Sequence, residues 1–481
     1  MKYPSLRVLC VVTLSLVLIF GLLPLSNLSH SRAATPRNLK DSFHAVESPD
    51  NLYMIRVGMD GEATCQEATF AESQYFRNPS EGELQEISPR VRIQAVDGLT
   101  ITLRGTTQLD ANPEAKDAFI RAAAHWEALI KSPITVVIDV DFGTTRFGTP
   151  YDPDVLGSTR TQLLGADGIY PDIREVMIEE ASNDSERILY NALPLNQLPT
   201  DKGNSANIVA ASSVLRAIGV IAAVADPAAE EPNFGAPPSI GFNSAFAFDF
   251  DPSNGVDPNS IDFDTVATHE IGHALGFTTM ASQTQSGTPD VNIWDFFRFA
   301  PGITSGNFVT SPRILNSGGQ HVFYAGGAEL ALSTGTTSQG GDGNQSSHWK
   351  ADEITGTTVG IMDPTIARGR HIDISENDKA VLETIGHSLN TVAQTVGATI
   401  NKTTFFPEDP SLSIKGSGFG TPIEIEINGV IVTPSRIKVK GAGAKLVVIG
   451  SSLANLNIVP GANTLRVRKF GVYSNPRTFN F

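Results

Sequence analysis

Cysteine is nearly absent from this chain of 481 residues, which contains only Cys10 and Cys65. Cys10 lies in an N-terminal segment that we expect to be removed, so the remaining chain keeps one thiol and has no internal disulfide. Stability must then come from core packing and from any bound metal. Long apolar runs are equally scarce: Val8–Leu25 is the one run long enough to concern a membrane. After its removal we expect no membrane span.

Residues 1–33 are typical of a secretory signal peptide. Lys2 and Arg7 precede the apolar run, and residues 31–33 supply small side chains for cleavage. The run is long for a signal, so an uncleaved membrane anchor is the alternative. Pro24 near its end favours cleavage. We therefore expect an exported protein that is secreted or held at the cell surface.

Positive charge is scarce in most of the chain, where 35 Lys and Arg stand against 51 Asp and Glu and the formal net charge is −16. Residues 401–481 reverse the balance, with ten Lys or Arg and four Asp or Glu. The acidic body argues against nucleic acid as a partner. The change of sign indicates a domain boundary. The basic region is a candidate contact for cell-surface polymer or polysaccharide, and an ordinary solvated face is the alternative.

Three regions follow the signal. Residues 34–95 show no sustained periodicity, which is typical of a pro-segment or N-terminal extension. Residues 96–395 mix helical and strand patterns and predict an α+β domain. Its expected elements are strands at 98–105, 133–142 and 238–251, a helix at 113–130, loops over 281–345 and a helix at 373–389.

Residues 403–481 predict a small all-β sandwich. The stretch "IEIEINGVIV" alternates on both sides of Asn428-Gly429, a strong hairpin signal. Further short strands are expected at "RIKVKG", "KLVVIG" and "NTLRVRK".

The segment "DTVATHEIGHALGFTT" (264–279) carries the chemistry. Asp262 or Asp264 is a good N-cap and Gly276 a good C-terminal stop, so we expect a helix over 264–275.

Within that helix His269 and His273 are four residues apart and project from one face. Glu270 lies to one side, where it can hold a water without ligating. Two neutral imidazoles, an open position and a general base are what zinc hydrolysis needs. Two histidines on a helix surface, matched by chance, are the alternative.

A zinc site needs at least three protein ligands. The downstream histidines are His321, His348, His371 and His387. We favour His348, which stands in "SSHWKADEITGTTVGIMDP", fourteen residues before Met362 and its tight turn. His371 is the second choice, while His321 and His387 are expected to be structural.

The segment "HEIGHALGF" resembles the active-site helix of the metzincin zinc proteases. Their common pattern has a histidine where this chain has Thr279. The leishmanolysin-like branch instead interrupts the motif with a large insertion and places its third histidine in an "SHW" context before a methionine turn. Residues 277–347, "SHW" at 347–349 and Met362 are similar to that arrangement. The resemblance implies a metzincin-like fold, His348 as third ligand, and Met362 beneath the zinc without binding it.

The C-terminal region resembles an IPT/TIG domain, an immunoglobulin-like module, in "LSIKGSGFG", "INGVIV" and "GVYSNPRTFNF". The resemblance covers about residues 405–481. It implies a module that binds a partner or acts as a spacer and does not catalyse.

Cys65 has two interpretations. In several metzincins a pro-segment cysteine occupies the open position of the zinc, and a thiolate is a good zinc ligand. This makes Cys65 a candidate inhibitory thiol, although "ATCQEAT" lacks the familiar flanking residues. A buried, incidental cysteine is the alternative.

Calcium is a weaker prediction. It would use the carboxylates of Asp249, Asp251, Asp257, Asp262 and Asp264. Their spacing is irregular, and loops and helix caps are the alternative.

The expected function is that of a secreted endopeptidase with one catalytic zinc and Glu270 as general base, acting on proteins or peptides. We expect an exposed strand over 238–251 to hold the extended substrate. The alternatives are a non-catalytic surface or adhesion protein stabilised by zinc, and a zinc hydrolase of another amide or an ester. Glu270 argues against the non-catalytic alternative, because a structural site needs no base.

Overall fold

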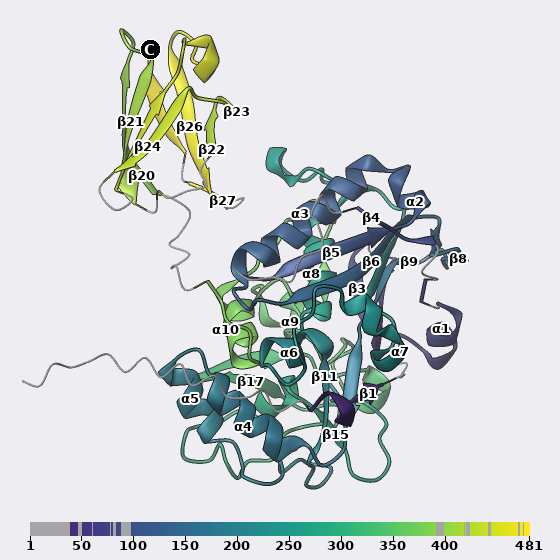
Figure 1. Ribbon diagram of the computed structural model, residues 1–481. Helices are drawn as coiled ribbons and strands as arrows, with labels where there is room; N and C mark the ends of the chain where they lie inside the picture. Colours follow the sequence, from purple (N-terminus) through teal and green to yellow (C-terminus); the bar gives the residue numbers. More distant parts are fainter. Residues whose placement is uncertain are drawn as a thin grey trace, which may run out of the picture. The chain divides into compact units, whose positions relative to one another are not determined.

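The computed structural model describes a body over residues 39–390 and a C-terminal module over residues 399–481 (Figure 1). Within these two parts, the description excludes residues 47–50, 60, 77, 80–82, 88–97, 418, 420–423, 441–443, 470, 471 and 475. The body mixes helices with strands and the module is built of strands, so the chain is α+β. The expected signal peptide (1–33) and the expected boundary at residue 95 lie outside the described residues. Within the described part, every helix is too short or too polar to span a bilayer.

An eight-stranded sheet with the order β19-β3-β2-β9-β12-β6-β5-β4 forms the centre of the body. Strands β5, β6 and β12 are parallel to one another, and β9 is antiparallel to β12. β5 and β6 confirm the strands expected at 98–105 and 133–142. The bounds are β19 (Thr365–Ile366), β3 (Ala63–Glu67), β2 (Leu52–Val57), β9 (Val155–Arg160), β12 (Ser239–Asn243), β6 (Thr135–Gly143), β5 (Thr100–Gly105) and β4 (Gln85–Glu86).

Helix α3 (Pro113–Leu129) makes the crossover between the parallel strands β5 and β6, as such strands require. It packs on β5 and lies beside helix α8 (Phe263–Ala274) (Figure 1). The indole Nε1 of Trp126 donates a hydrogen bond to the carbonyl of Thr268 at 2.9 Å. The helix expected over 113–130 is confirmed to within one residue, and the apolar side chains that predicted it are buried: Phe119, Ala122, Ala123, Trp126, Leu129 and Ile130.

Helix α8 has clear signals at both ends. The carboxylate of Asp262 accepts hydrogen bonds from the backbone N–H groups of Asp264 and Thr265 at 3.1 and 3.3 Å. At the other end Gly276 has a φ of +120°, a conformation that favours glycine. The helix expected over 264–275 is confirmed to within one residue at each end. All of its side chains are buried, so α8 lies inside the body.

The expected N-terminal extension contributes three strands, β2, β3 and β4, to the central sheet. β2 pairs antiparallel with β9, and β3 pairs with both β2 and β19. β2 therefore covers the edge that β9 would otherwise expose. A separate pro-segment over 34–95 stays a prediction, but residues 52–67 lie within the strand order of the body.

The expectation of an exposed strand over 238–251 is wrong. Only Ser239–Asn243 forms β12, which is buried and pairs with β6 and β9 on its two edges. A strand with both edges occupied cannot receive an extended substrate. The chain then turns into the short strand β13 (Phe248–Asp249), which pairs with β14 (Ile261–Asp262). The phenylalanines that imitated a longer strand lie on this turn and in or beside β13, and they pack against the core: Phe246, Phe248 and Phe250.

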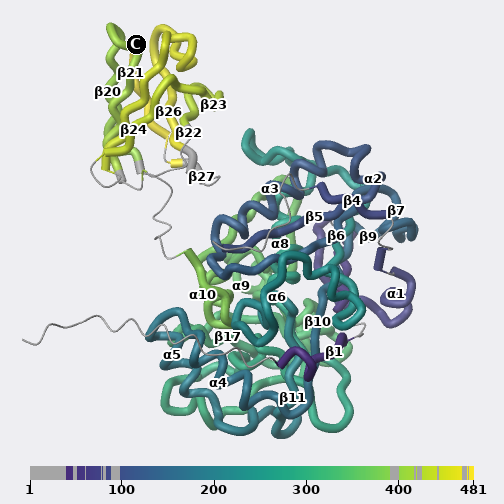
Figure 2. The backbone as a smooth tube through the Cα atoms, viewed as in Figure 1, coloured from purple at the N-terminus to yellow at the C-terminus, as the bar shows by residue number. Residues whose placement is uncertain are grey.

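Smaller sheets complete the body. One has the order β1-β10-β11-β15, with β1 at the edge beside β10 (Figure 2), and another the order β16-β17-β18. The hairpin β17–β18 lies in a stretch where only loops were expected. The bounds are β1 (His44–Ala45), β10 (Leu163–Ala166), β11 (Asn207–Ala211), β15 (Asp290–Asn292), β16 (Arg298–Phe299), β17 (His321–Ala325), β18 (Ala328–Leu332), β7 (Thr145–Arg146) and β8 (Thr149–Pro150).

The remaining α-helices of the body are short and surround these sheets. Helix α10 confirms the core of the helix expected at 373–389. The bounds are α1 (Phe70–Tyr75), α2 (Thr107–Asp110), α4 (Tyr170–Glu180), α5 (Asp184–Asn191), α6 (Ser212–Ala217), α7 (Glu231–Phe234), α9 (Asp352–Thr355) and α10 (Glu376–Thr384).

The C-terminal module consists of two antiparallel sheets, β20-β21-β25-β24 and β23-β22-β26-β27, with β28 also on β26. Side chains of both sheets share one core, separate from that of the body. Asn428 and Gly429 have φ angles of +53° and +77° and make the tight turn between β22 and β23, which confirms the predicted hairpin. The bounds are β20 (Thr399–Phe406), β21 (Ser411–Ser417), β22 (Glu424–Ile427), β23 (Val430–Val432), β24 (Arg436–Lys440), β25 (Lys445–Ile449), β26 (Ala462–Lys469), β27 (Val472–Tyr473) and β28 (Arg477–Asn480).

We expect Gly276→Ala to lower the free energy of unfolding of the body by about 2–4 kcal/mol, from backbone strain and overpacking together. A Cβ at this position would lie 2.4 Å from Cγ2 of Val214. Gly287→Ala is the matched control, because Gly287 also has a positive φ but has nothing within 4 Å of an added Cβ. Denaturant titration followed by tryptophan fluorescence measures the body alone, since Trp126, Trp294 and Trp349 all lie there. An equal decrease in the free energy of unfolding in Gly276→Ala and Gly287→Ala would contradict the packing argument.

Candidate metal centre

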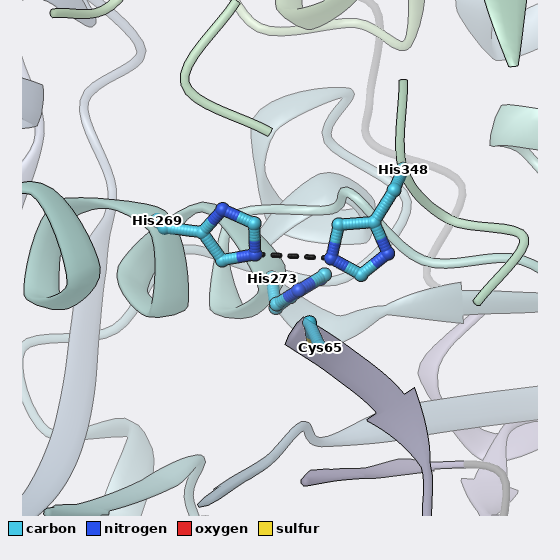
Figure 3. Close-up of side chains that lie close together, drawn as sticks. All are labelled: Cys65, His269, His273 and His348. Carbon is cyan, nitrogen blue, oxygen red and sulfur yellow. Dashed lines mark hydrogen bonds between the residues drawn. The ribbon is translucent and has the colours of Figure 1, made fainter. Parts of the chain in front are cut away.

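Three histidines from two distant parts of the chain converge inside the body (Figure 3). His269 and His273 project from α8, and His348 comes from the segment between β18 and α9. The hairpin strand β18 supports that segment, because the N–H of Ser333 donates to the carbonyl of His348 at 3.0 Å. One ligand atom from each histidine, together with the thiol of Cys65, lies within 4.8 Å of all the others. The structure thus brings together all four residues that the sequence suggested as ligands or inhibitor.

Backbone carbonyls fix the tautomer of each imidazole. A carbonyl can only accept, so an Nδ1 bonded to it carries the hydrogen and leaves a lone pair on Nε2. His269, His273 and His348 donate from Nδ1 to the carbonyls of Ile361 at 2.8 Å, Phe277 at 2.7 Å and Gln345 at 3.1 Å, respectively.

The three Nε2 atoms therefore face one another as acceptors. Those of His269 and His348 are 3.0 Å apart. That of His273 is buried without a hydrogen-bond partner among the described residues. Buried lone pairs of this kind need a cation between them. Their geometry is that of a metal site in which the second nitrogen of each ring holds the ligand in place.

Burial keeps the imidazoles neutral. It lowers the pKa of His269 to about 4. Burial, and then the neighbouring imidazoles, also hold the pKa values of His273 and His348 well below the ordinary range. Neutral imidazole is the form that binds a metal, so these side chains are competent ligands at neutral pH.

Glu270 lies beside this group without belonging to it. Its Oε1 is 4.0 Å from Nε2 of His269, and its Oε2 has no hydrogen-bond partner within the described part of the chain. The side chain is 1% exposed, and burial raises its pKa to about 8. Glu270 is placed to exchange a proton with a group at the metal.

Cys65 reaches the histidines from strand β3 (Figure 3). Its backbone N–H donates to the carbonyl of Pro364 at 2.7 Å. The residue is 3% exposed, and burial, followed by the charge of Glu270, raises the pKa of its thiol. A bound metal would oppose that shift, because coordination favours the thiolate. Three imidazoles and one thiol supply a complete set of four ligands.

Met362 packs against α8 at Gly272, one residue before His273. The close contact requires glycine there, because a Cβ on residue 272 would lie 2.6 Å from Sδ of Met362. The methionine is fully buried, and the structure places it against the helix that carries two of the histidines.

Asp378 and Trp349 position the third histidine; the sequence analysis named Trp349 only as part of the "SHW" motif and missed Asp378. Nε1 of Trp349 donates to one carboxylate oxygen of Asp378 at 2.7 Å, and the N–H of Ile361 donates to the other at 2.9 Å. The N–H of Trp349 also donates to the carbonyl of Met362 at 3.0 Å. The sequence held one signal, a capping box in which Ser375 precedes Asp378 by three residues.

The other histidines and Thr279 have different partners. The hydroxyl of Thr279 donates to Asp295 at 2.6 Å, which directs it away from the metal centre. The remaining pairs are His125 with Asp264 at 2.8 Å, His321 with Arg298 at 3.0 Å, His371 with Asp262 at 2.5 Å and His387 with the carbonyl of Leu275 at 2.8 Å.

The carboxylates suggested for calcium act as local acceptors. Asp249 accepts from the N–H groups of Asp251 and Asp257 at 2.9 and 2.8 Å. Asp262 caps α8, and Asp264 pairs with Arg121 at 2.7 Å. These carboxylates belong to neither group of side chains that can hold a metal among the described residues, so helix capping and loop bonding account for them.

No protein-family model, curated protein or solved structure matches this chain. The side chains of the centre therefore decide what it can do. They offer three oriented nitrogen donors, one sulfur donor and one adjacent buried carboxylate.

We expect His348→Ala to weaken binding of Zn²⁺ or Co²⁺ by more than about 100-fold, because it removes one of three oriented nitrogen donors. His371→Ala is the matched control, since His371 was the second choice for this ligand and bonds to Asp262 instead. Competition with a chromophoric chelator measures both affinities. If His348→Ala binds metal as tightly as wild type and His371→Ala binds it more weakly, the third ligand is wrongly assigned.

Proposed function

We propose that this protein is a zinc-dependent endopeptidase. The observation that carries the proposal is the convergence of His269, His273 and His348, each oriented through Nδ1, beside a buried glutamate outside the ligand group. Three imidazoles, with or without a thiolate, suit Zn²⁺. The lone pair on Nε2 of His273 fits that ion, which would give it the partner it lacks among the described residues.

Zinc bound at this centre would supply a Lewis acid that polarises the scissile carbonyl and makes water more acidic. Glu270 accepts the proton of the attacking water and delivers it to the leaving amine. Burial raises the pKa of Glu270, and a zinc ion beside it would oppose that shift, so the carboxylate would be able to take up the proton and return it. Thr279 takes no part, since its hydroxyl donates to Asp295.

The resemblance to leishmanolysin-like metzincins agrees with this proposal. Under it, the body is a metzincin-like catalytic domain with Met362 beneath the zinc. The module over 403–481 is an IPT/TIG-like domain of immunoglobulin type that binds or spaces, and its two-sheet core and tight hairpin support that assignment. The signal-like residues 1–33 support export to a secreted or cell-surface location, with protein or peptide substrates.

One observation favours a second candidate function, that of a non-catalytic protein stabilised by zinc. Cys65 brings the ligand group to four, and closed four-ligand sites are typical of structural zinc. Glu270 favours the catalytic alternative, because burying a carboxylate oxygen without a partner is unfavourable and a structural site has no use for it.

We therefore infer that Cys65 is a displaceable fourth ligand that keeps the peptidase latent. Two features support this. The thiol sits where an open position would otherwise remain. The strand beside it, β2, covers the edge of β9, the kind of edge on which an extended peptide could pair.

We expect Cys65→Ala to raise hydrolysis of unfolded casein at least about tenfold while zinc stays bound, since three histidines remain and one position opens. Thr64→Ala is the control: it changes the same strand, but neighbouring side chains point to opposite faces. In Co²⁺-substituted protein the thiolate-to-metal absorption band should disappear from Cys65→Ala and persist in Thr64→Ala. A zinc-loaded Cys65→Ala variant without peptidase activity would favour the non-catalytic function.

In the Cys65→Ala background, we expect Glu270→Ala to lower the rate of peptide hydrolysis by about 10²–10⁴-fold, the usual contribution of a general base. Zinc content should stay at one ion per chain, because Glu270 is not a ligand. Glu376→Ala is the control, since that carboxylate is 83% exposed and lies on α10. Comparable activity in the Glu270→Ala variant would exclude the proposed mechanism.

A further inference from the structure

A second group of potential metal ligands lies next to the Met362 turn. It consists of Asp352 and Glu353 at the start of α9 and Asp363, the residue after Met362. One carboxylate oxygen from each lies within 4.8 Å of the others. The group contains no nitrogen or sulfur ligand, so it differs in chemistry from the histidine centre.

Asp363 supplies the independent sign of a ligand. The residue is 3% exposed, and its Oδ2 is buried without a hydrogen-bond partner among the described residues. Its other oxygen accepts from the backbone N–H of Thr365 at 3.2 Å and from the Thr365 hydroxyl at 2.9 Å. A carboxylate oxygen left without a donor inside the protein is unfavourable unless a cation reaches it.

Three oxygens of the group share one hydroxyl donor. The Thr365 hydroxyl lies 2.9 Å from both oxygens of Glu353 and from one of Asp363. A hydroxyl carries one hydrogen, so it can satisfy only one of these three acceptors at a time. The oxygens converge on one small region in the way that oxygen ligands surround a cation.

The charges are also incompletely balanced. Arg370 lies 2.5 Å from Asp352 and balances one of the three carboxylates. Burial, and then the charge of Asp352, raises the pKa of Asp363 to about 7. Burial and the adjoining Asp352 also raise the pKa of Glu353. When ionised, Glu353 and Asp363 carry two negative charges, which equal the charge of one divalent cation, and a cation bound there would oppose both pKa shifts.

We propose that Asp352, Glu353 and Asp363 bind a calcium ion. Calcium prefers carboxylate and other oxygen ligands and tolerates irregular geometry, completed by water and backbone carbonyls. The ion would join the start of α9 to the segment that leads from Met362 into β19. This site is distinct from the carboxylates at 249–264, and it does not depend on whether the histidine centre is catalytic.

The test is a calorimetric titration of the full-length, zinc-loaded protein with CaCl₂, alongside a titration with MgCl₂. We expect one calcium ion per chain and much weaker binding of magnesium, which demands stricter geometry. Asp363→Asn and Glu353→Gln should each weaken calcium binding at least about tenfold, because the affinity follows the number of charged ligands. Asp184→Asn is the control, since that carboxylate is 92% exposed on α5 and should leave the affinity unchanged.

Asp363 is buried, so Asp363→Asn can impair folding. Glu353 is exposed, so Glu353→Gln tests the site without that risk. Calcium should also raise the Tm of wild type and of Asp184→Asn, and raise it less in Glu353→Gln. Absence of calcium binding in wild type, or unchanged binding in both cluster variants, would overturn the proposal. Zinc content and casein hydrolysis are measured separately, so this result and the peptidase proposal can fail independently.

Discussion

The buried carboxylate of Asp378 joins the two chain segments that complete the metal centre. One of its oxygens accepts from the indole of Trp349, the neighbour of His348, and the other accepts from the N–H of Ile361. The carbonyl of Ile361 in turn orients His269. Asp378 is fully buried, and burial raises its pKa. Its charge is therefore tolerable only while these donors are in place. The positions of His348 and of the segment at Ile361 therefore depend on one hydrogen-bond network, centred on Asp378 of α10.

The metal centre brings several polar side chains together in the buried interior of the body. His269, His273 and His348 each use Nδ1 to hold a carbonyl, which leaves three Nε2 lone pairs directed at one point. Glu270 and Cys65 add two groups whose charged forms are disfavoured by burial. A divalent cation held here would relieve all these penalties together, because it would pair the lone pairs and favour the thiolate and the carboxylate. Metal binding at this group would therefore be coupled to folding of the region.

Local signals predicted helices α3, α8 and α10 well, because caps and periodicity act over a few residues, whereas the bounds of the other helices were not predicted. Asp262 and Gly276 delimit α8 as their chemistry requires, and the apolar face of α3 predicted its bounds. The place of β2 and β3 could not be read from the sequence, since their partners β9 and β19 lie far along the chain. The strand expected over 238–251 failed because phenylalanines on a turn imitated alternation. Cys65 was a candidate on chemistry alone, and its place is fixed by contacts with distant residues, the pairing of β3 with β2 and the backbone bond to Pro364.

The short segment that begins at Met362 connects the features on which function would depend. Met362 packs on α8, Asp363 enters the acidic cluster, and the carbonyl of Pro364 accepts from the strand that carries Cys65. Thr365 then pairs with Thr64 in the central sheet. Because these residues are adjacent, whatever holds Asp363 also restrains the packing of Met362 and the strand beside the thiol. Any coupling between the acidic cluster and the histidine centre therefore needs no long pathway. It follows from the stiffness of a few consecutive peptide units, each fixed by a different neighbour.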